Sequence, residues 1–225
     1  MIGTHSENDT QNVTVDPAVL DAARALADRP GRTLLGIVGA PGAGKSTLTE
    51  ALITALGSAQ AQCVPMDGYH LSNRELARLG RSDRKGAPDT FDATGYRDLL
   101  TRIRKTTAES IYAPAFYREI EEPIAASLVV TPECPLVITE GNYLLLEDAP
   151  WPQVAAELDE VWYVDVPTPL RETWLVERHM RFGRTEAEAR DWVATTDRPN
   201  AERIEATRTR AHRTLVFDGP RLRFA

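Results

Sequence analysis

The sequence predicts an α/β fold whose central sheet is mainly parallel. Short apolar runs typical of buried strands alternate along the chain with stretches that favour helices. A glycine-rich turn at residues 39–46 joins the first of these runs to a helix. Acidic residues, Asp67 and Glu140, follow two later runs. Because ligands gather beyond the carboxyl ends of parallel strands, these acids are expected beside the glycine-rich turn.

The first half of the chain shows clear helix boundaries. Asp16 can cap a helix over residues 17–27, and Pro17 suits its first turn. The turn at 39–46 leads into a second helix over 47–56, which Gly57 ends. Asp92 is expected to cap a helix over 93–105. Residues 111–130 indicate two extended segments around a charged bend at 118–123.

The second half continues the alternation. Thr168 and Pro169 open a long helix to about residue 182. Thr185 and Glu188 form a capping box for a helix through about residue 195, and residues 199–211 favour a last helix. The strands that complete the sheet are predicted from the apolar runs at 33–38, 62–66, 136–139, 161–166 and 214–217.

Length and charge limit the class of protein. The chain has 225 residues, which suits one domain at 15–225 after a disordered tail at 1–14. A formal net charge of -7 disfavours nonspecific nucleic-acid binding, and no apolar run is long enough to span a membrane. We therefore expect a cytoplasmic protein without nucleic-acid or membrane partners. Within the domain we expect insertions at about 68–92 and 111–130, and a lid at about 178–200.

The turn after the first strand carries the pattern G-x-x-x-x-G-K-[ST], the phosphate-binding loop or P-loop. Glycines let successive backbone N–H groups surround phosphate oxygens, and the next helix directs its positive end at the anion. The lysine suits the β- and γ-phosphates, and the following hydroxyl suits Mg²⁺. The fold is therefore expected to be a P-loop NTPase-type three-layer sandwich. The residues predicted to bind the nucleotide here are Gly39, Ala40, Pro41, Gly42, Ala43, Gly44, Lys45, Ser46 and Thr47.

The two acids at strand ends are candidates for the chemistry of phosphoryl transfer. Such a reaction needs positioning, charge neutralisation and a proton acceptor for the attacking hydroxyl. Asp67 could accept that proton or help to hold Mg²⁺, and the alternative is a cap on the turn before Gly68. Glu140 could hold Mg²⁺ with Ser46, and the alternative is a partly buried carboxylate bonded to backbone.

Basic residues cluster near the end of the long helix, at Arg178, His179, Arg181 and Arg184. Guanidinium groups there could fold over the nucleotide and offset the charge of the transferring group. The alternative is that these cations interact favourably with the negative end of the helix dipole. We favour Arg181 and Arg184 as catalytic and expect His179 to be a surface or packing residue.

A mixture of rings and charges in the two insertions suits a polar small molecule, although a solvated loop and core aromatic residues are the competing interpretations. Candidates that we noted without selecting them are Asn73, Arg74, Tyr112, Phe116 and Arg118. The residues predicted to bind the acceptor are Tyr69, His70, Arg84, Lys85, Phe91, Tyr117 and Asn142.

Four segments together resemble the superfamily of uridine kinase, phosphoribulokinase and bacterial pantothenate kinase. They are the P-loop, Asp67-Gly68-Tyr69-His70, the segment from Arg84 to Asp92, and the segment from Thr139 to Leu144. The likeness spans about residues 30–217 and is nearest to the bacterial branch labelled fructose-transport-system kinases or nucleoside/nucleotide kinase-like proteins. Uridine kinases usually have Ser where this chain has Gly68, and pantothenate kinases are longer, so neither acceptor is indicated.

The resemblance implies an ATP- and Mg²⁺-dependent kinase that phosphorylates a hydroxyl of a small metabolite such as a sugar, nucleoside or pantothenate-like compound. It implies that Asp67 is the base, that Arg181 and Arg184 lie in a lid, and that Asn200 lies near the nucleotide base. Relatives are often oligomers, so a homo-oligomer is one expectation. A nucleotide-dependent switch or NTPase that acts on a protein partner is the alternative, although an Asn-Lys-x-Asp motif for guanine is absent.

Overall fold

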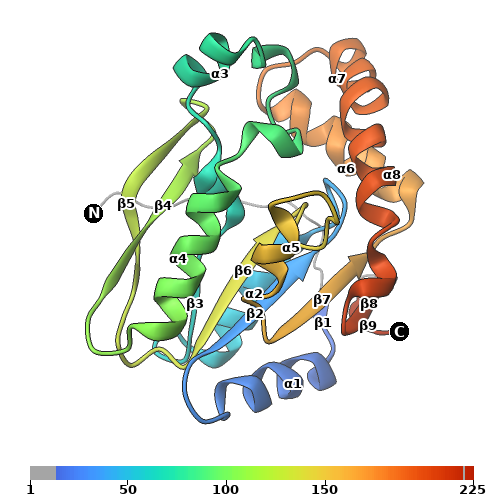
Figure 1. The fold of residues 1–225 in the computed structure, drawn as a ribbon. Coiled ribbons are helices and arrows are strands. Elements are labelled where there is room, and N and C mark those ends of the chain that lie inside the picture. Colours follow the sequence, from blue (N-terminus) through green and yellow to red (C-terminus); the bar gives the residue numbers. More distant parts are fainter. Residues whose placement is uncertain (1–13, 220) are drawn as a thin grey trace.

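The computed structural model describes residues 14–219 and 221–225, and it shows a seven-stranded sheet beside a separate hairpin (Figure 1). The order of strands in the sheet is β1-β9-β8-β7-β2-β6-β3, and every neighbouring pair is parallel except β8 with β9. The hairpin pairs β4 (Ile111–Tyr117) with β5 (Glu122–Val130). The strands of the sheet are β1 (Thr14–Val15), β2 (Thr33–Val38), β3 (Ala61–Cys63), β6 (Leu136–Gly141), β7 (Glu160–Asp165), β8 (Arg213–Asp218) and β9 (Arg221–Phe224).

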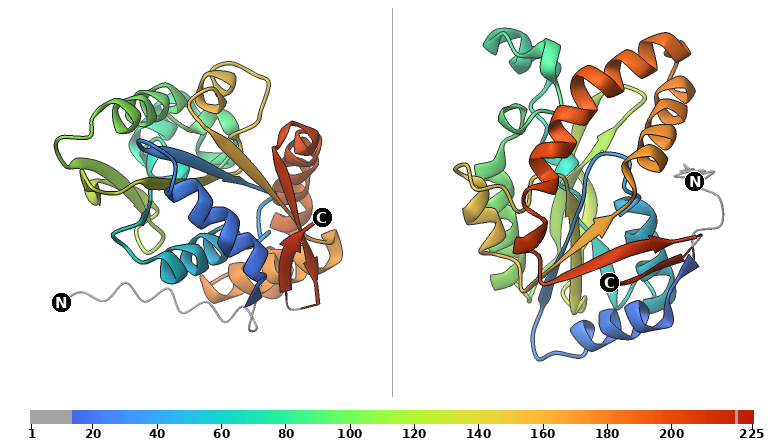
Figure 2. Two further views of the ribbon diagram at one scale, coloured as in Figure 1. Left: turned by 90° about the horizontal axis from the view of Figure 1, so that it is seen from below. Right: turned by 90° about the vertical axis from the view of Figure 1, so that its right-hand side faces the viewer.

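Helices cover both faces of the sheet, which gives three layers (Figure 2). One core lies between the sheet and the helices α4 and α5, and a second lies between the sheet and α1 and α2. Along β2, Leu34 and Val38 enter the first core while Leu35 and Ile37 enter the second, as the two-residue period of a strand requires. The helices are α1 (Pro17–Ala27), α2 (Lys45–Leu56), α3 (Asn73–Leu79), α4 (Ala93–Lys105), α5 (Trp151–Ala155), α6 (Thr168–Arg181), α7 (Glu186–Trp192) and α8 (Arg198–Glu205).

The predicted fold class is confirmed, and several boundaries agree with the sequence. Helices α1 and α4 and strand β2 have the predicted bounds, and the capping box of Thr185 and Glu188 is present. Strands β1 and β9 were not predicted, and β1 includes Thr14, which we had assigned to the tail. Residues 1–13 of that tail lie outside the described residues. Strand β3 ends at Cys63 rather than at 66, so Asp67 lies in the short 3₁₀ turn Met66–Tyr69.

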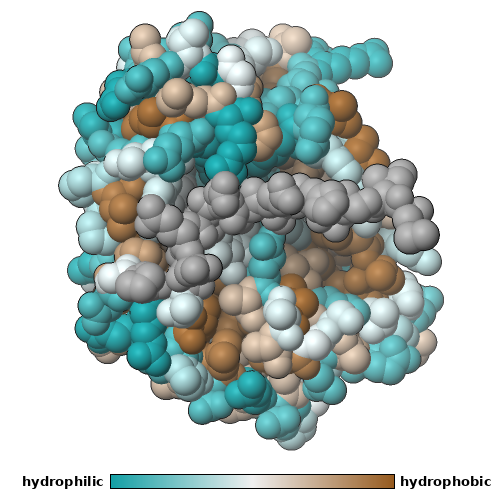
Figure 3. All heavy atoms as spheres, turned by 180° about the vertical axis from the view of Figure 1, so that it is seen from behind, coloured by the Kyte–Doolittle hydropathy of each residue, from teal (hydrophilic) through white to brown (hydrophobic). Residues whose placement is uncertain are grey.

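The surface is mixed in character. On the face opposite to that of Figure 1, hydrophilic side chains surround separate hydrophobic patches (Figure 3). Large exposed apolar side chains occur on the hairpin, at Tyr112, Ile120, Ile124 and Val129, and at the end of α6. Within the described part of the chain, no helix combines the length and the apolar character needed to cross a membrane.

A buried arginine ties the edge of the fold together. Arg32 precedes β2 and its side chain is 8% exposed. Its five N–H groups all donate to backbone carbonyl oxygens, so the guanidinium is fully satisfied without a carboxylate. The acceptors, at 2.7 to 3.0 Å, are the carbonyls of Ile103, Thr106, Thr131, Pro132 and Cys134. One side chain therefore joins the end of α4 and the β5–β6 connection to the start of β2.

We expect Arg32→Ala to lower the free energy of unfolding by about 3 kcal/mol or more, because it leaves buried carbonyl groups without donors. Urea denaturation measures this change. Arg24→Ala is the matched control, since Arg24 forms an exposed ion pair with Asp21 on α1, and it should change stability by less than about 0.5 kcal/mol. Equal effects of the two substitutions would contradict the structural role of Arg32.

Candidate active site

The P-loop has the backbone shape that its glycines predict. Gly42 and Gly44 have φ angles of 78° and 77°, in the left-handed region that favours glycine. A Cβ atom on Gly42 would also lie 2.7 Å from Cγ of Leu175 on α6, so the loop packs tightly under that helix. Gly44 precedes α2, which begins at Lys45, two residues earlier than predicted. The first N–H groups of α2 therefore belong to the loop itself.

The ammonium of Lys45 lies in the mouth of this loop. It donates to the carbonyl oxygens of Gly39 at 2.9 Å and Ala40 at 3.2 Å, and to Oδ1 of Asn142 at 2.7 Å. Burial lowers the pKa of Lys45 from its ordinary value of 10.5 to about 8, and the nearby carboxylates of Glu140 and Asp67 oppose that change. Asn142, predicted to bind the acceptor, is thus a positioning partner of the lysine in this structure.

Strand pairing brings Glu140 to the loop. Residues of β6 pair in parallel register with those of β2, so Glu140 follows the sheet to the same edge as the P-loop. The Ser46 hydroxyl donates to Oε1 of Glu140 at 2.7 Å. Burial raises the pKa of the Glu140 carboxyl, while Lys45 and the hydrogen bond from Ser46 lower it. A cation beside this carboxylate would compensate its burial.

These two oxygen donors suit Mg²⁺. Magnesium usually binds proteins through one or two carboxylates or hydroxyls and completes its shell with waters and substrate phosphates. Among the described residues there is no cluster of three or more His, Cys, Asp or Glu side chains that could hold a metal alone. The donor set Ser46 and Glu140 therefore fits a magnesium ion that arrives with a phosphate ligand.

The 3₁₀ turn that carries Asp67 packs closely against the hairpin. A Cβ atom on Gly68 would lie 2.4 Å from the carbonyl oxygen of Pro114 in β4, so only glycine fits there without displacement. The Asp67 carboxylate lies 3.7 Å from the Arg118 guanidinium and lines the same pocket as Lys45. Gly68 stands where uridine kinases usually have Ser. The close contact between the turn and β4 gives a packing reason for this difference.

Rings form one wall beside Asp67. The imidazole of His70 packs between Phe91 and Phe116, with ring centroids 4.0 and 4.6 Å away. Its Nδ1 lies 2.8 Å from the carbonyl oxygen of Asp67. Because a carbonyl only accepts, that nitrogen carries the proton, and Nε2 of the neutral ring is left as an acceptor. Burial lowers the pKa of His70 below its ordinary value of 6.5, which Asp67 opposes.

The lid side of the pocket comes from α6, α7 and a π-helical segment, Val193–Asp197, that joins α7 to α8. Nε2 of His179 lies 2.8 Å from Oδ2 of Asp197, and the Arg184 guanidinium stacks 3.7 Å from the centroid of the Trp192 ring. π-Helical turns occur often at functional sites, because the extra residue redirects side chains. Here the segment contributes Thr196 and Asp197 to the pocket wall.

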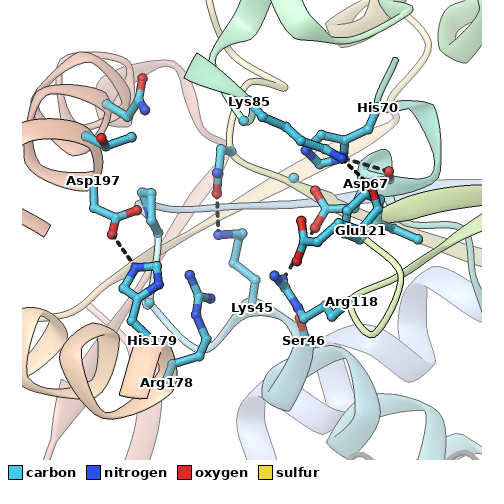
Figure 4. Close-up of a pocket in the computed structure, with 18 of the residues that line it drawn as sticks. Lys45, Ser46, Asp67, His70, Lys85, Arg118, Glu121, Arg178, His179 and Asp197 are labelled. Atoms are coloured by element: carbon cyan, nitrogen blue, oxygen red, sulfur yellow. Dashed lines mark hydrogen bonds and ion pairs between the residues drawn. The ribbon is translucent and has the colours of Figure 1, made fainter. Parts of the chain in front are cut away.

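Arg178 is the lid residue that points toward Lys45 (Figure 4). Its side chain makes no hydrogen bond or ion pair within the described part of the chain. Burial, and then the charge of Arg118, lower the pKa of its guanidinium, which remains charged at neutral pH. A half-buried guanidinium whose donors have no protein partner is free to bind a ligand, so its place beside the loop indicates an anionic one.

These elements enclose a pocket of about 490 Å³, with the P-loop, the hairpin and the lid on three sides. It gathers most residues predicted for the site. The predicted residues that line it are Pro41, Gly42, Lys45, Ser46, Asp67, His70, Lys85, Phe91, Glu140, Asn142, Arg184 and Asn200. The loop residues Gly39, Ala40, Ala43, Gly44 and Thr47 form the adjoining backbone and first turn of α2.

Besides these five loop residues, four predicted residues lie outside the pocket lining. Tyr69 packs on Tyr96, with ring centroids 5.2 Å apart. Arg84 forms an ion pair with Asp89 at 2.7 Å. Tyr117 lies exposed at the end of β4, and Arg181 is exposed at the end of α6. Arg178, which we had noted but ranked below Arg181, lines the pocket because it lies almost one turn earlier on α6.

Other pocket residues had weaker signals in the sequence. Phe116 and Arg118 belong to a mixed segment from which they were not selected, and His179 was expected to be a surface or packing residue. Glu121, Trp192 and Asp197 were not considered as site residues. Their place depends on the detailed shape of the hairpin turn, of which only a charged bend was predicted, and on the π-helical segment, which no sequence pattern predicts.

The chain resembles known proteins over most of its length, although no family model matches it. C227.14 of Schizosaccharomyces pombe, provisionally named a uridine kinase, is 34% identical over 200 residues, which cover 84% of each chain. The crystal structure of a provisionally named fructose transport system kinase from Silicibacter sp. TM1040 has 37% identity and a TM-score of 0.80, and the match covers 89% of this chain and 98% of that one.

A third protein supports the fold alone. The structure of YFH7 from Saccharomyces cerevisiae, described as a P-loop containing kinase with a circular permutation, has a TM-score of 0.73 at 19% identity and covers 91% of this chain and 98% of its own. The predicted resemblance is thereby confirmed. The chain belongs to the uridine kinase-like P-loop kinases, ATP-dependent phosphotransferases with an alcohol group as acceptor.

Proposed function

We propose that this enzyme transfers the γ-phosphoryl group of ATP to a hydroxyl of a small metabolite, such as a sugar, nucleoside or pantothenate-like compound, bound between the P-loop and the hairpin. The observation that carries the proposal is that the Asp67 carboxylate and the Lys45 ammonium line one pocket from different elements. A phosphate-binding group and a proton acceptor in one pocket are what a kinase needs. The cytoplasm, where ATP and free metabolites meet, is the proposed location.

The P-loop and its neighbours would bind the phosphates. Backbone N–H groups of the loop and the amino end of α2 suit phosphate oxygens, and Lys45 would bind the β- and γ-phosphates. Its present acceptors, two carbonyls and Asn142, keep the ammonium in position in the same way that phosphate oxygens would. Asn200 and the stacked pair of Arg184 and Trp192 line the lid side, which is our proposed place for the nucleoside part.

Ser46 and Glu140 would hold Mg²⁺, with Asp67 as a further candidate ligand. When bound, the ion neutralises charge on the β- and γ-phosphate oxygens. The residues of the chain contribute the remaining steps. Asp67 accepts the proton of the attacking hydroxyl, and Arg178 stabilises the charge on the transferring group. The lid residues exclude water, which would otherwise compete with the acceptor.

The first test is acceptor-dependent release of ADP with Mg-ATP and a panel of nucleosides, pantothenate and sugars. We expect Asp67→Asn to lower turnover by about 10²-fold or more, because the amide cannot accept the proton, while the Kd for ATP changes little. Titration calorimetry measures nucleotide binding. Lys45→Ala is the comparison variant and should weaken both turnover and nucleotide binding.

Two outcomes would change the assignment. If Asp67→Asn weakens turnover and nucleotide binding equally, Asp67 serves the metal or the structure rather than the proton transfer. ATP hydrolysis that ignores every acceptor and responds only to another protein would instead favour a nucleotide-dependent switch.

A second prediction separates two arginines of α6. We expect Arg178→Gln to lower kcat by about 10²-fold or more, since it removes a cation that lines the pocket beside the transferring group, and Arg181→Gln to change kcat by less than about threefold. Steady-state kinetics measure both. Thermal unfolding of the free protein should show no loss of stability in Arg178→Gln, because its half-buried guanidinium makes no hydrogen bond or ion pair with the described residues that the substitution could remove. The reverse ranking in kcat would restore Arg181 as the catalytic residue of the lid.

A further inference from the structure

Arg118 has an unusual place in the pocket. It is the first residue after β4, in the turn of the hairpin, and it lines the pocket beside Asp67. In the described part of the chain it makes one ion pair, 3.7 Å from the Asp67 carboxylate, and no hydrogen bond. Its side chain is 44% exposed. A guanidinium carries five N–H donors in a rigid fork, so this group has unused donors in the pocket.

The turn that carries Arg118 is fixed by its surroundings. Glu121 has a φ of 52°, which costs a residue other than glycine about 1 kcal/mol. Two side chains stabilise it by donating to its carbonyl oxygen: the Lys85 ammonium and Nδ2 of Asn73, the latter at 3.1 Å. Lys85 also donates to Oδ1 of Asn73 at 2.6 Å and lies 5.2 Å from the centroid of the Phe116 ring. The turn that carries Arg118 is therefore held by contacts with Asn73 at the start of α3 and with Lys85 in the loop that follows α3.

The neighbouring cations of the pocket have other contacts or lie in other parts of it. Lys85 donates to two acceptors of the protein and holds the turn. Lys45 lies in the P-loop, and Arg178 reaches the pocket from the lid near Lys45 (Figure 4). Arg118 is the cation that the hairpin adds on the Asp67 side without a hydrogen-bonded partner in the described residues.

We propose that the acceptor carries an anionic oxygen group, a carboxylate or a phosphate, in addition to the hydroxyl that is phosphorylated, and that Arg118 binds this group. The inference rests on the proposed kinase function and narrows its acceptor class. The guanidinium fork matches the paired oxygens of carboxylates and phosphates, whereas a neutral hydroxyl uses one donor only. Because Arg118 and Asp67 are 3.7 Å apart, one small molecule can present its hydroxyl to Asp67 and its anion to Arg118.

The anion would also balance the positive charge of Arg118 in this part of the pocket. With a neutral acceptor, Arg118 would share its single carboxylate with a hydroxyl that must lose its proton to the same Asp67. An anionic group gives the guanidinium its own partner and leaves the Asp67 carboxylate to the reacting hydroxyl. The neutral His70 ring, with Nε2 as an acceptor, can receive a hydrogen bond from a second hydroxyl of the same molecule.

The test compares matched pairs of acceptors in which a hydroxyl or hydroxymethyl group replaces the anion. The carboxylate pairs are glycerate with glycerol and pantothenate with panthenol, and the phosphate pair is fructose 6-phosphate with fructose. We expect kcat/KM for the anionic member to exceed that of its neutral partner at least tenfold in one class of pair. The class that shows the preference distinguishes a carboxylate from a phosphate.

Variants connect the preference to the residue. Arg118→Gln should reduce the ratio between anionic and neutral members to less than about twofold, mainly through the KM for the acceptor, and should leave the KM for ATP within about twofold. Arg118→Lys should retain part of the preference, because it keeps the charge but loses the fork. Arg97→Gln is the control for charge, since Arg97 lies on α4 with Asp98 and Gln153 as partners.

Binding of the same six compounds to the protein saturated with a nonhydrolysable ATP analogue gives a readout that does not need turnover. Binding of the anionic members, lost in Arg118→Gln, would support the inference. It is overturned if neutral members bind or react as well as anionic ones, if no anionic member binds, or if Arg118→Gln raises the KM for ATP instead. Turnover of neutral acceptors alone would leave the kinase function intact, whereas ATP binding without any acceptor-dependent turnover would count against both.

Discussion

The site depends on the parallel pairing of β2 with β6. That pairing places Val38 opposite Gly141, so the loop that leaves β2 and the segment that leaves β6 begin at the same edge of the sheet. Two contacts between distant parts of the chain result, from Ser46 to Glu140 at 2.7 Å and from Lys45 to Asn142 at 2.7 Å. Because both strands are buried and their register is fixed, these side chains meet without any movement of the chain. The phosphate-binding half of the pocket is therefore a direct product of sheet topology.

The same site contains groups that weaken the free protein. Glu140, Lys45 and Arg178 are half-buried charges whose pKa values are displaced by partial burial, and Glu121 adopts a left-handed backbone conformation. Such features persist when the rest of the fold is stable enough to support them. Arg32 illustrates the opposite design, since each of its donors has a carbonyl partner and it stabilises the fold without facing a ligand. A buried arginine with all its partners is structural, and one without partners in a pocket indicates a ligand.

Sequence patterns predicted the features that local chemistry determines. The P-loop, the caps at Asp16, Asp92 and Thr185, and the acid near the end of β6 all depend on residues close to one another in the chain. Asp67 was predicted to be in the site, although it lies in a 3₁₀ turn rather than at a strand end. Whether Arg178 or Arg181 faces the pocket depends on how α6 is rotated about its axis relative to the P-loop. The positions of the arginines in the sequence do not reveal that rotation. Arg118 required the hairpin turn, whose shape comes from Lys85 and Asn73 in another segment.

The pocket also shows how an acidic chain can bind anions. The formal net charge is -7, yet the cations Lys45, Lys85, Arg118, Arg178 and Arg184 all line one cavity. The acids of the same cavity have local tasks, since Glu140 accepts from Ser46 and Asp197 pairs with His179. Charges inside a low-dielectric pocket act on a ligand more strongly than distant surface charges, which solvent screens. Net charge therefore limits contacts of the whole surface with nucleic acid, while the substrates respond to the few charges that the loop, the hairpin and the lid bring together.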